Sequence, residues 1–126
     1  VIMGKPDKKQ AAVYDTVKRA QEEALKKIKA GVKGSSPDKA AADIVADAGY
    51  EKYMGKGLGH GIGLLIHEEP FMSPTCERIL EAGNVITVEP GIYIPDWGGI
   101  RIEDSVIVSK EGCEIITNSS KELISI

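Results

Sequence analysis

The sequence contains few cysteines and no long apolar run. Cys76 and Cys113 are its two cysteines, and they stand apart, without the paired spacing of a zinc site or a redox motif. We therefore expect free thiols in a reducing compartment, which indicates a cytoplasmic protein. No segment approaches the roughly 20 apolar residues that a membrane-spanning helix needs, and no signal peptide is visible. A membrane is therefore not expected as a partner.

The chain also lacks a strong excess of charge of either sign. Its net charge is −3, which gives no electrostatic basis for binding nucleic acid. The 42% hydrophobic and 28% charged fractions are those of an ordinary soluble globular protein. A length of 126 residues is typical of one domain with a real core. Because the first residue is Val1 and not methionine, we expect this domain to be part of a longer protein.

The first third of the chain has the spacing of an amphipathic helix. Pro6 and Asp7 suit a helix start, since proline fits the first turn and an acidic residue complements the helix dipole. Apolar residues then recur at three- and four-residue spacing until Gly31 ends the segment. This apolar stripe consists of Val13, Val17, Ala20, Ala24 and Ile28.

A second helix is predicted to begin at Ser36 and Pro37, a capping residue followed by proline in the first turn. Gly49 supplies its left-handed stop. Its apolar stripe consists of Ala41, Ile44, Val45 and Ala48. The aspartates on or beside the two helices are expected to be surface charges; they are Asp7, Asp15, Asp38, Asp43 and Asp47.

The second half has the texture of strands. Residues 85–94, 99–108 and 113–117 are strand candidates, joined by a turn at 96–99 and a tighter turn at 110–112. Residues 76–82 can form a short helix or a loop. Two helices followed by an antiparallel meander indicate an α+β fold in a single domain over residues 1–126.

Four polar residues lie where a purely structural strand pattern would not place them: His60, His67, Glu89 and Glu103. β-branched apolar residues flank both glutamates, so we expect each to be partly buried. A buried carboxylate is costly unless it is paired or bound to a metal. One imidazole and two carboxylates suit Mn, Fe, Co or Zn.

Each feature also has a structural interpretation. His60, in a glycine-rich turn, could be a polar loop residue, and Glu89 before a proline could close a strand. Glu103 could form a salt bridge with Arg101, two residues away on the same strand face. The glycine spacing around His60 does not match a phosphate-binding loop.

Three motifs occur in order along the chain. They are Gly-His-Gly-Ile-Gly at His60, Val-Glu-Pro-Gly-Ile-Tyr at Glu89 and Gly-Gly-Ile-Arg-Ile-Glu-Asp at Glu103. Together they resemble the pita-bread metallopeptidases, within them the Xaa-Pro dipeptidase (prolidase) and aminopeptidase P branch, over nearly the whole chain. The resemblance implies the C-terminal part of a catalytic domain, without its upstream strands, in a hydrolase of Xaa-Pro bonds. Its substrate would be a peptide with proline after the first residue.

The resemblance also implies a role for each polar residue. His60, Glu89 and Glu103 would bind two divalent ions (Mn, Co, Zn or Fe), with Glu103 bridging both. Glu89 would also move the proton from water to the leaving amine. His67 would contact the substrate and help to stabilise the tetrahedral intermediate, and Arg101 would hold Glu103 or a neighbouring carboxylate.

Two departures from the family pattern limit these implications. Lys56 occupies a position, four residues before His60, where many members have a further histidine. Lysine donates hydrogen bonds but does not titrate near neutrality unless it is strongly desolvated, so substrate contacts or pH dependence should change. The family's first two ligands are aspartates upstream of Val1, so we expect an incomplete site and a chain that is inactive alone.

Two other functions fit the same motifs, and one physical consequence follows. A methionine aminopeptidase is the enzymatic rival, although its last motif usually lacks the form seen here, and a non-catalytic pita-bread binding module is the other. Ile92, Tyr93 and Trp97 are candidate apolar wall residues of a proline pocket.

A sheet edge left uncovered by the upstream half favours pairing with another chain, so we expect self-association or a homodimer.

Overall fold

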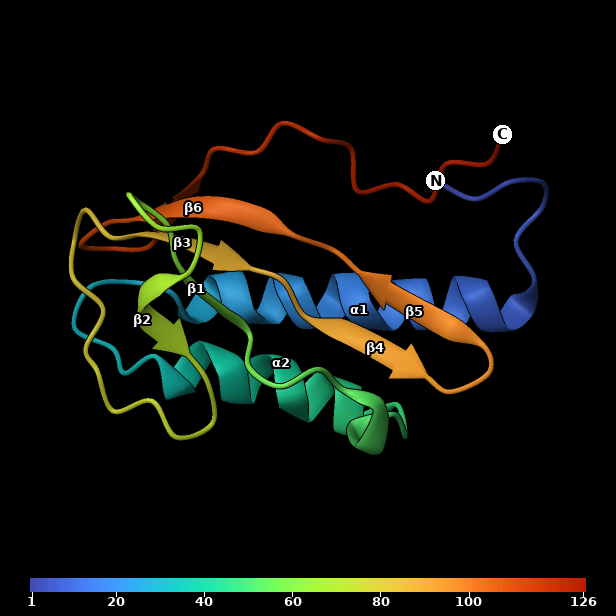
Figure 1. Ribbon diagram of the computed structural model, residues 1–126, viewed down its shortest axis with the longest axis horizontal. Helices are drawn as coiled ribbons and strands as arrows, with labels where there is room; N and C mark the ends of the chain where they lie inside the picture. The colour runs from blue at the N-terminus through green and yellow to red at the C-terminus, as the bar shows by residue number, and fades with distance from the viewer.

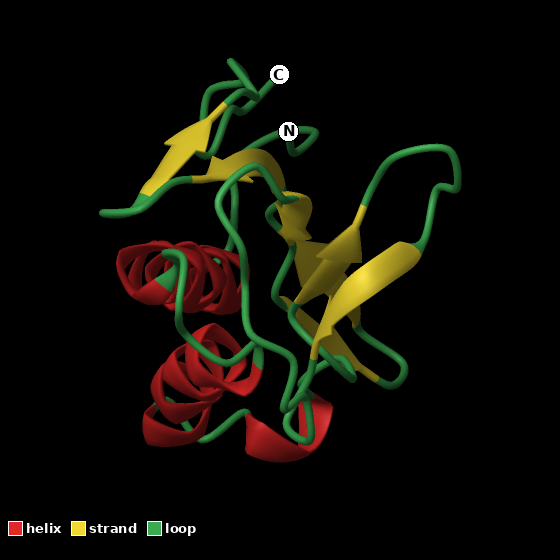
Figure 2. Cartoon of the chain, turned by 90° about the vertical axis from the view of Figure 1, so that its left-hand side faces the viewer, coloured by secondary structure: helices red, strands yellow, loops and turns green.

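The computed structural model describes all residues, 1–126, and packs two helices against antiparallel strands. The elements are α1 (Lys8–Lys27), α2 (Ser35–Asp47), the 3₁₀-helix η1 (Glu51–Tyr53), β1 (Gly59–Gly61), β2 (Glu68–Met72), β3 (Val85–Val88), β4 (Gly91–Ile94), β5 (Gly98–Arg101), β6 (Asp104–Val108) and β7 (Cys113–Ile115). Figure 2 shows the helices on one side of the molecule and the strands on the other. The predicted α+β class is confirmed. None of the helices is both long and apolar enough to cross a membrane.

Helix α1 forms where its apolar spacing predicts it. Asp7 is its N-cap, and a capping box joins Asp7 to Gln10, whose backbone N–H donates to Asp7 Oδ1 at 2.7 Å. All five residues of the predicted stripe are buried. The helix packs against α2 and against β3, β4 and β5, as its course beneath the strands in Figure 1 shows. It is thus the main support beneath the sheet.

Helix α2 begins two residues earlier than predicted. Gly34, and not Ser36, is the N-cap residue, and no side chain caps the helix. Carbonyls of a neighbouring loop replace a side-chain cap. The backbone N–H groups of Gly34 and Ser35 donate to the carbonyls of Arg78 and Cys76. Residues 76–82 are accordingly a loop, the second of the two predicted options. Gly49 ends the helix segment with a φ of 79°, as predicted.

The strands form two separate sheets, whereas the sequence predicts strands that run without a break through residues 85–94 and 99–108. One sheet has the order β2-β1-β3-β6-β7, and β4 and β5 form a separate hairpin. The predicted strand 85–94 breaks at Glu89 and Pro90, and the predicted strand 99–108 breaks opposite, at Ile102 and Glu103. The reason is that Pro90 has no N–H to donate to a ladder. The break therefore lies at both glutamates that the sequence singles out.

Strands β1 and β2 are absent from the sequence-based expectation. For β1 the reason is that a glycine-rich segment has low strand propensity. The glycines serve close packing here. A Cβ at Gly59 would collide with the backbone of Thr87 on β3, and a Cβ at Gly61 would collide with the backbone of Glu69 on β2. Only glycine lets β1 lie between these two strands, so the glycines place His60 within the sheet.

Asp38 corrects the expectation that the helical aspartates are surface charges. Its side chain is buried in the first turn of α2, and Oδ1 has no hydrogen-bond partner. Burial raises the pKa of Asp38 to about 6, and a hydrogen bond from the Leu58 backbone offsets part of this effect. Helical spacing alone could not reveal this burial, because the loop that covers Asp38 arrives from residues 54–58.

Replacing Asp38 with asparagine tests this burial. The folded pKa of about 6 lies above the ordinary value of 3.8, so folding favours the protonated acid. The stability that Asp38 provides is present below pH 4 and is lost as the pH rises through 6. Asp38→Asn should therefore raise the free energy of unfolding at pH 7 by about 2 kcal/mol and change it little at pH 4. Urea unfolding at both pH values measures this, and a variant destabilised at pH 7 would contradict it.

Candidate active site

The site is built around a contact between His60 on β1 and Glu89 at the end of β3. His60 Nε2 lies 3.0 Å from Glu89 Oε1, and the two side chains are only 13% and 12% exposed. On the other side of the ring, Nδ1 lies 3.0 Å from the carbonyl oxygen of Gly61. A proton on Nδ1 donated to that carbonyl leaves the lone pair of Nε2 directed at the carboxylate. In that tautomer a proton or a metal ion between Nε2 and Oε1 would satisfy both atoms.

Thr87 holds both members of this pair. Its hydroxyl donates to Glu89 Oε1 at 2.8 Å and accepts the backbone N–H of His60 at 3.0 Å. Thr87 and Glu89 share one face of the chain because they are two residues apart on an extended segment. One buried hydroxyl therefore orients the carboxylate and fixes the backbone of the histidine.

The second carboxylate oxygen of Glu89 contacts Arg101. Arg101 Nη1 lies 3.2 Å from Glu89 Oε2, so Arg101 pairs with Glu89 and not with Glu103. The register explains this choice, because Arg101 on β5 lies opposite Gly91 on β4, two residues beyond Glu89. The ring of Tyr93 lies 5.7 Å from the guanidinium carbon, within cation–π range. Each oxygen of Glu89 thus has its own partner.

His67 and Lys56 also reach this region. The rings of His67 and His60 have centroids 4.3 Å apart. A pocket of about 320 Å³ is lined by both histidines together with Lys56, Glu89, Tyr93 and Arg101. Of the three predicted wall residues, Tyr93 lines this pocket, whereas Ile92 is wholly buried in the core. The structure therefore brings five of the six predicted site residues to one pocket.

Glu103 is the exception among the predicted residues. Its side chain is exposed, which corrects the expectation of a partly buried carboxylate. Side chains alternate along this segment, so Ile102 and Asp104 face inward and Glu103 faces outward. The buried carboxylate is Asp104, only 1% exposed and 2.9 Å from Lys121 Nζ. No three His, Cys, Asp or Glu side chains of the chain come close enough to hold a metal together.

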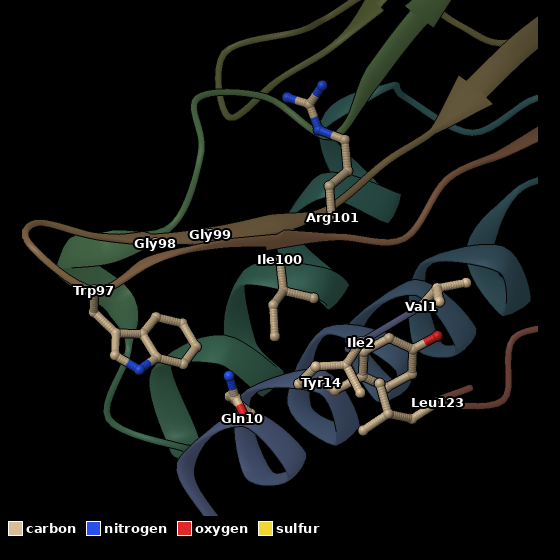
Figure 3. A pocket seen from close by; sticks show the side chains of 10 residues that line it. All are labelled: Val1, Ile2, Gln10, Tyr14, Trp97, Gly98, Gly99, Ile100, Arg101 and Leu123. Atoms are coloured by element: carbon tan, nitrogen blue, oxygen red, sulfur yellow. The ribbon is translucent and has the colours of Figure 1, made fainter. Parts of the chain in front are cut away.

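A different pocket of about 340 Å³ lies on the opposite side of the β4–β5 hairpin. Figure 3 shows Ile100 pointing into it while the Arg101 guanidinium extends away from it. Its lining includes Tyr14, Trp97 and Leu123 but no histidine, aspartate or glutamate. Arg101 therefore faces the site, and the acid–base and ligand chemistry lies on that side of the hairpin.

Two of the three predicted ligands, His60 and Glu89, are placed to hold a divalent metal ion. His60 Nε2 and Glu89 Oε1 are the nitrogen and oxygen ligands that Mn, Co, Zn and Fe accept. The hydrogen-bonded Nδ1 of His60 and the Thr87 hydroxyl on Glu89 supply the outer contacts that orient such ligands. A metal ion between His60 Nε2 and Glu89 Oε1 would thus be held by both atoms.

Comparison with known proteins identifies the family. The model of metallopeptidase family M24 matches residues 1–110. The Xaa-Pro dipeptidase of Pyrococcus horikoshii is 43% identical over 124 residues, which is 98% of this chain and 35% of that protein. The structure of a Xaa-Pro dipeptidase from Bacillus anthracis is 47% identical with a TM-score of 0.96, covering 98% of this chain and 35% of that one. For an X-Pro aminopeptidase from Thermotoga maritima MSB8, the identity is 41%, the TM-score 0.95 and the coverage 98% and 35%.

This chain belongs to metallopeptidase family M24. The family resemblance drawn from the three motifs is confirmed, as is the predicted likeness to the fold of the Xaa-Pro peptidases. The chain spans about a third of the length of the relatives that it matches.

Sequence reasoning missed Thr87, although a signal for it exists. In Thr-Val-Glu the hydroxyl and the carboxylate are two residues apart and so share a face of a strand. The partner strand that presents His60 to this face could not be inferred, because β1 itself was not predicted. The pairing of Arg101 with Glu89 likewise depends on the hairpin register.

Replacing Thr87 with valine tests the role of its hydroxyl. Thr87→Val keeps the shape of the side chain but leaves the His60 N–H and Glu89 Oε1 without this partner. We expect the free energy of unfolding to fall by about 1–3 kcal/mol, the cost of an unsatisfied buried group. Thr87→Ser retains the hydroxyl and is the control in the same urea titration. Equal stability of the two variants would contradict the assignment.

Proposed function

We propose that this chain supplies part of the active site of a metal-dependent peptidase that hydrolyses Xaa-Pro bonds. The observation that carries the proposal is the 3.0 Å contact between His60 Nε2 and Glu89 Oε1, two metal-ligand atoms facing each other beside a pocket. Membership of family M24 supports the reaction class. Relatives named Xaa-Pro dipeptidase and X-Pro aminopeptidase favour this substrate over that of a methionine aminopeptidase.

In this proposal His60, Glu89 and Glu103 are metal ligands. Two divalent ions, when bound, acidify water and polarise the scissile carbonyl. Glu103 lies in the strand break opposite Glu89, so both carboxylates belong to one region of the fold. The exposed side chain of Glu103 must turn toward the site to join the other two. Upstream aspartates supply the remaining ligands, so the chain by itself is inactive.

The remaining side chains handle protons and substrate. Glu89 takes a proton from the attacking water and gives it to the leaving amine, a role that a carboxylate beside the pocket can fill. Arg101, paired with Glu89 Oε2, keeps that carboxylate turned toward the pocket. His67, whose ring centroid lies 4.3 Å from that of His60, donates to the developing oxyanion. Lys56, on the pocket rim, contacts the substrate as a hydrogen-bond donor.

Hydrolysis of Ala-Pro and Gly-Pro tests the proposed activity. We expect the protein that contains this chain, supplied with Mn²⁺ or Co²⁺, to cleave both dipeptides. Glu89→Gln should lower kcat by about 10² to 10⁴, the range typical of a lost general acid–base group. Glu114→Gln removes the same charge from an exposed residue of β7 and is the matched control.

Two results would contradict these proposals separately. Undiminished turnover by Glu89→Gln would exclude the proton-transfer role. Full turnover by residues 1–126 alone, with two bound metals, would show that this chain carries a complete site.

We further propose that the chain acts in the cytoplasm and self-associates through the β2 edge of the large sheet. Strand β2 is an edge strand, and its residue Phe71 is 43% exposed. The preceding loop presents three adjacent apolar side chains to solvent: Leu64, Leu65 and Ile66, which are 102%, 65% and 78% exposed. An unpaired edge beside an apolar loop is suited to pairing with a second copy.

Light scattering of residues 1–126 tests self-association. We expect a mass above that of the 13.5 kDa monomer, increasing with concentration. Leu64→Ser combined with Leu65→Ser should shift the distribution toward the monomer, because both residues lie outside the core. Ile124→Ser, at an exposed residue of the C-terminal segment, is the control. A monomer at high concentration would contradict the proposal.

A further inference from the structure

Gln21 is a polar residue on the buried face of α1. Its side chain is wholly buried, next to the valines and alanines of the apolar stripe. Nε2 donates to two backbone carbonyls, that of Val88 at 3.1 Å and that of Ile102 at 3.3 Å. Oε1 is buried without a partner. An apolar side chain would fill this space without burying an unpaired oxygen, so the donor group is what the position requires.

The two carbonyls lie at the two sides of the strand break. Val88 is the last residue of β3 and immediately precedes Glu89, while Ile102 immediately precedes Glu103. Ile102 lies outside the strands, and the backbone hydrogen bonds outside helices and strands include none donated to its carbonyl. Gln21 therefore supplies a bond at a point where the sheet ladder does not. The –NH₂ group of Gln21 must face these two carbonyls, because the side-chain oxygen in its place would be repelled by both carbonyl oxygens.

Anchoring these carbonyls also anchors the glutamates. A carbonyl group and the N and Cα atoms of the following residue lie in one rigid peptide plane. The bond to the Val88 carbonyl therefore restrains the Cα of Glu89, and the bond to the Ile102 carbonyl restrains the Cα of Glu103. One –NH₂ group holds both planes, and it comes from a helix that packs on β3, β4 and β5.

We propose that Gln21 is a positioning residue that fixes Glu89 and Glu103 relative to each other for metal binding. The metal-binding part rests on the proposed function, whereas the coupling of the two backbone segments does not. Gln21 touches neither substrate nor metal in this scheme. Its amide acts through the backbone of the two ligand residues.

The coupling is tested in the metal-free protein by NMR. Gln21→Met keeps the length and apolar bulk of the side chain but removes the donor. We expect the backbone amide resonances of Glu89 and Glu103 to shift together, and the hydrogen exchange of the Glu89 amide, which donates to the Leu58 carbonyl, to accelerate. Thr16→Val is the matched control, because Thr16 is a buried polar residue of the same helix whose hydroxyl bonds only to Ala12 within that helix. Unchanged Glu89 and Glu103 resonances in Gln21→Met would overturn the proposal.

A second variant covers the case in which Gln21→Met does not fold. Gln21→Glu, protonated in its buried setting, can donate one hydrogen bond in place of two. We expect one of the two resonances to shift in this variant and the other to stay. If both resonances stay in Gln21→Glu, or shift no more than they do in Thr16→Val, the coupling of the two backbone segments through Gln21 is contradicted.

Metal titration calorimetry with Mn²⁺, on the protein that contains this chain, tests the consequence for the site. Gln21→Met should bind Mn²⁺ about 10- to 100-fold more weakly, the usual effect of losing a contact that orients a ligand. Thr16→Val should bind it as the unchanged protein does. Equal affinity of Gln21→Met and the unchanged protein would overturn the positioning role. If even the unchanged protein binds no Mn²⁺, the proposed function fails, and the NMR result still decides the coupling.

Discussion

The break that Pro90 makes in the sheet is the constraint on which the site depends. Without an N–H at this position the ladder between β3 and β6 cannot continue, and the chain resumes pairing as the β4–β5 hairpin. Glu89 is thereby freed from a regular strand position, and its two oxygens face different partners. The hairpin register then brings Arg101 to one oxygen. The missing N–H of Pro90 thus ends the pairing of β3 with β6 at the position where the candidate site lies.

Close backbone approach is the second requirement, and glycine provides it. Strand β1 lies between β2 and β3 only because Gly59 and Gly61 have no side chains to collide with the backbones beside them. This places the His60 ring against Glu89 at low exposure, with Thr87 bonded to both residues. The glycines around the histidine therefore act on strand packing.

The contact between His60 Nε2 and Glu89 Oε1 connects the geometry with the family. Two acceptor atoms at 3.0 Å repel each other unless a proton or a metal ion lies between them. A metallopeptidase family is therefore chemically consistent with this contact, independent of any sequence comparison. The chain covers about a third of its relatives, and the exposed Glu103 and the exposed apolar loop before β2 are the features that a larger assembly would have to accommodate.

Local sequence determined the helices and the ligand motifs, because helical spacing, caps and residue chemistry act over a few neighbours. The stripe of α1, the stop at Gly49 and the choice of His60 and Glu89 as candidate site residues all follow from it. Tertiary structure decided which groups meet. The burial of Asp38, the exposure of Glu103 and the pairing of Arg101 depend on segments distant in sequence. Periodicity defines the buried face of a helix, but only the packed fold decides which backbone groups that face will meet.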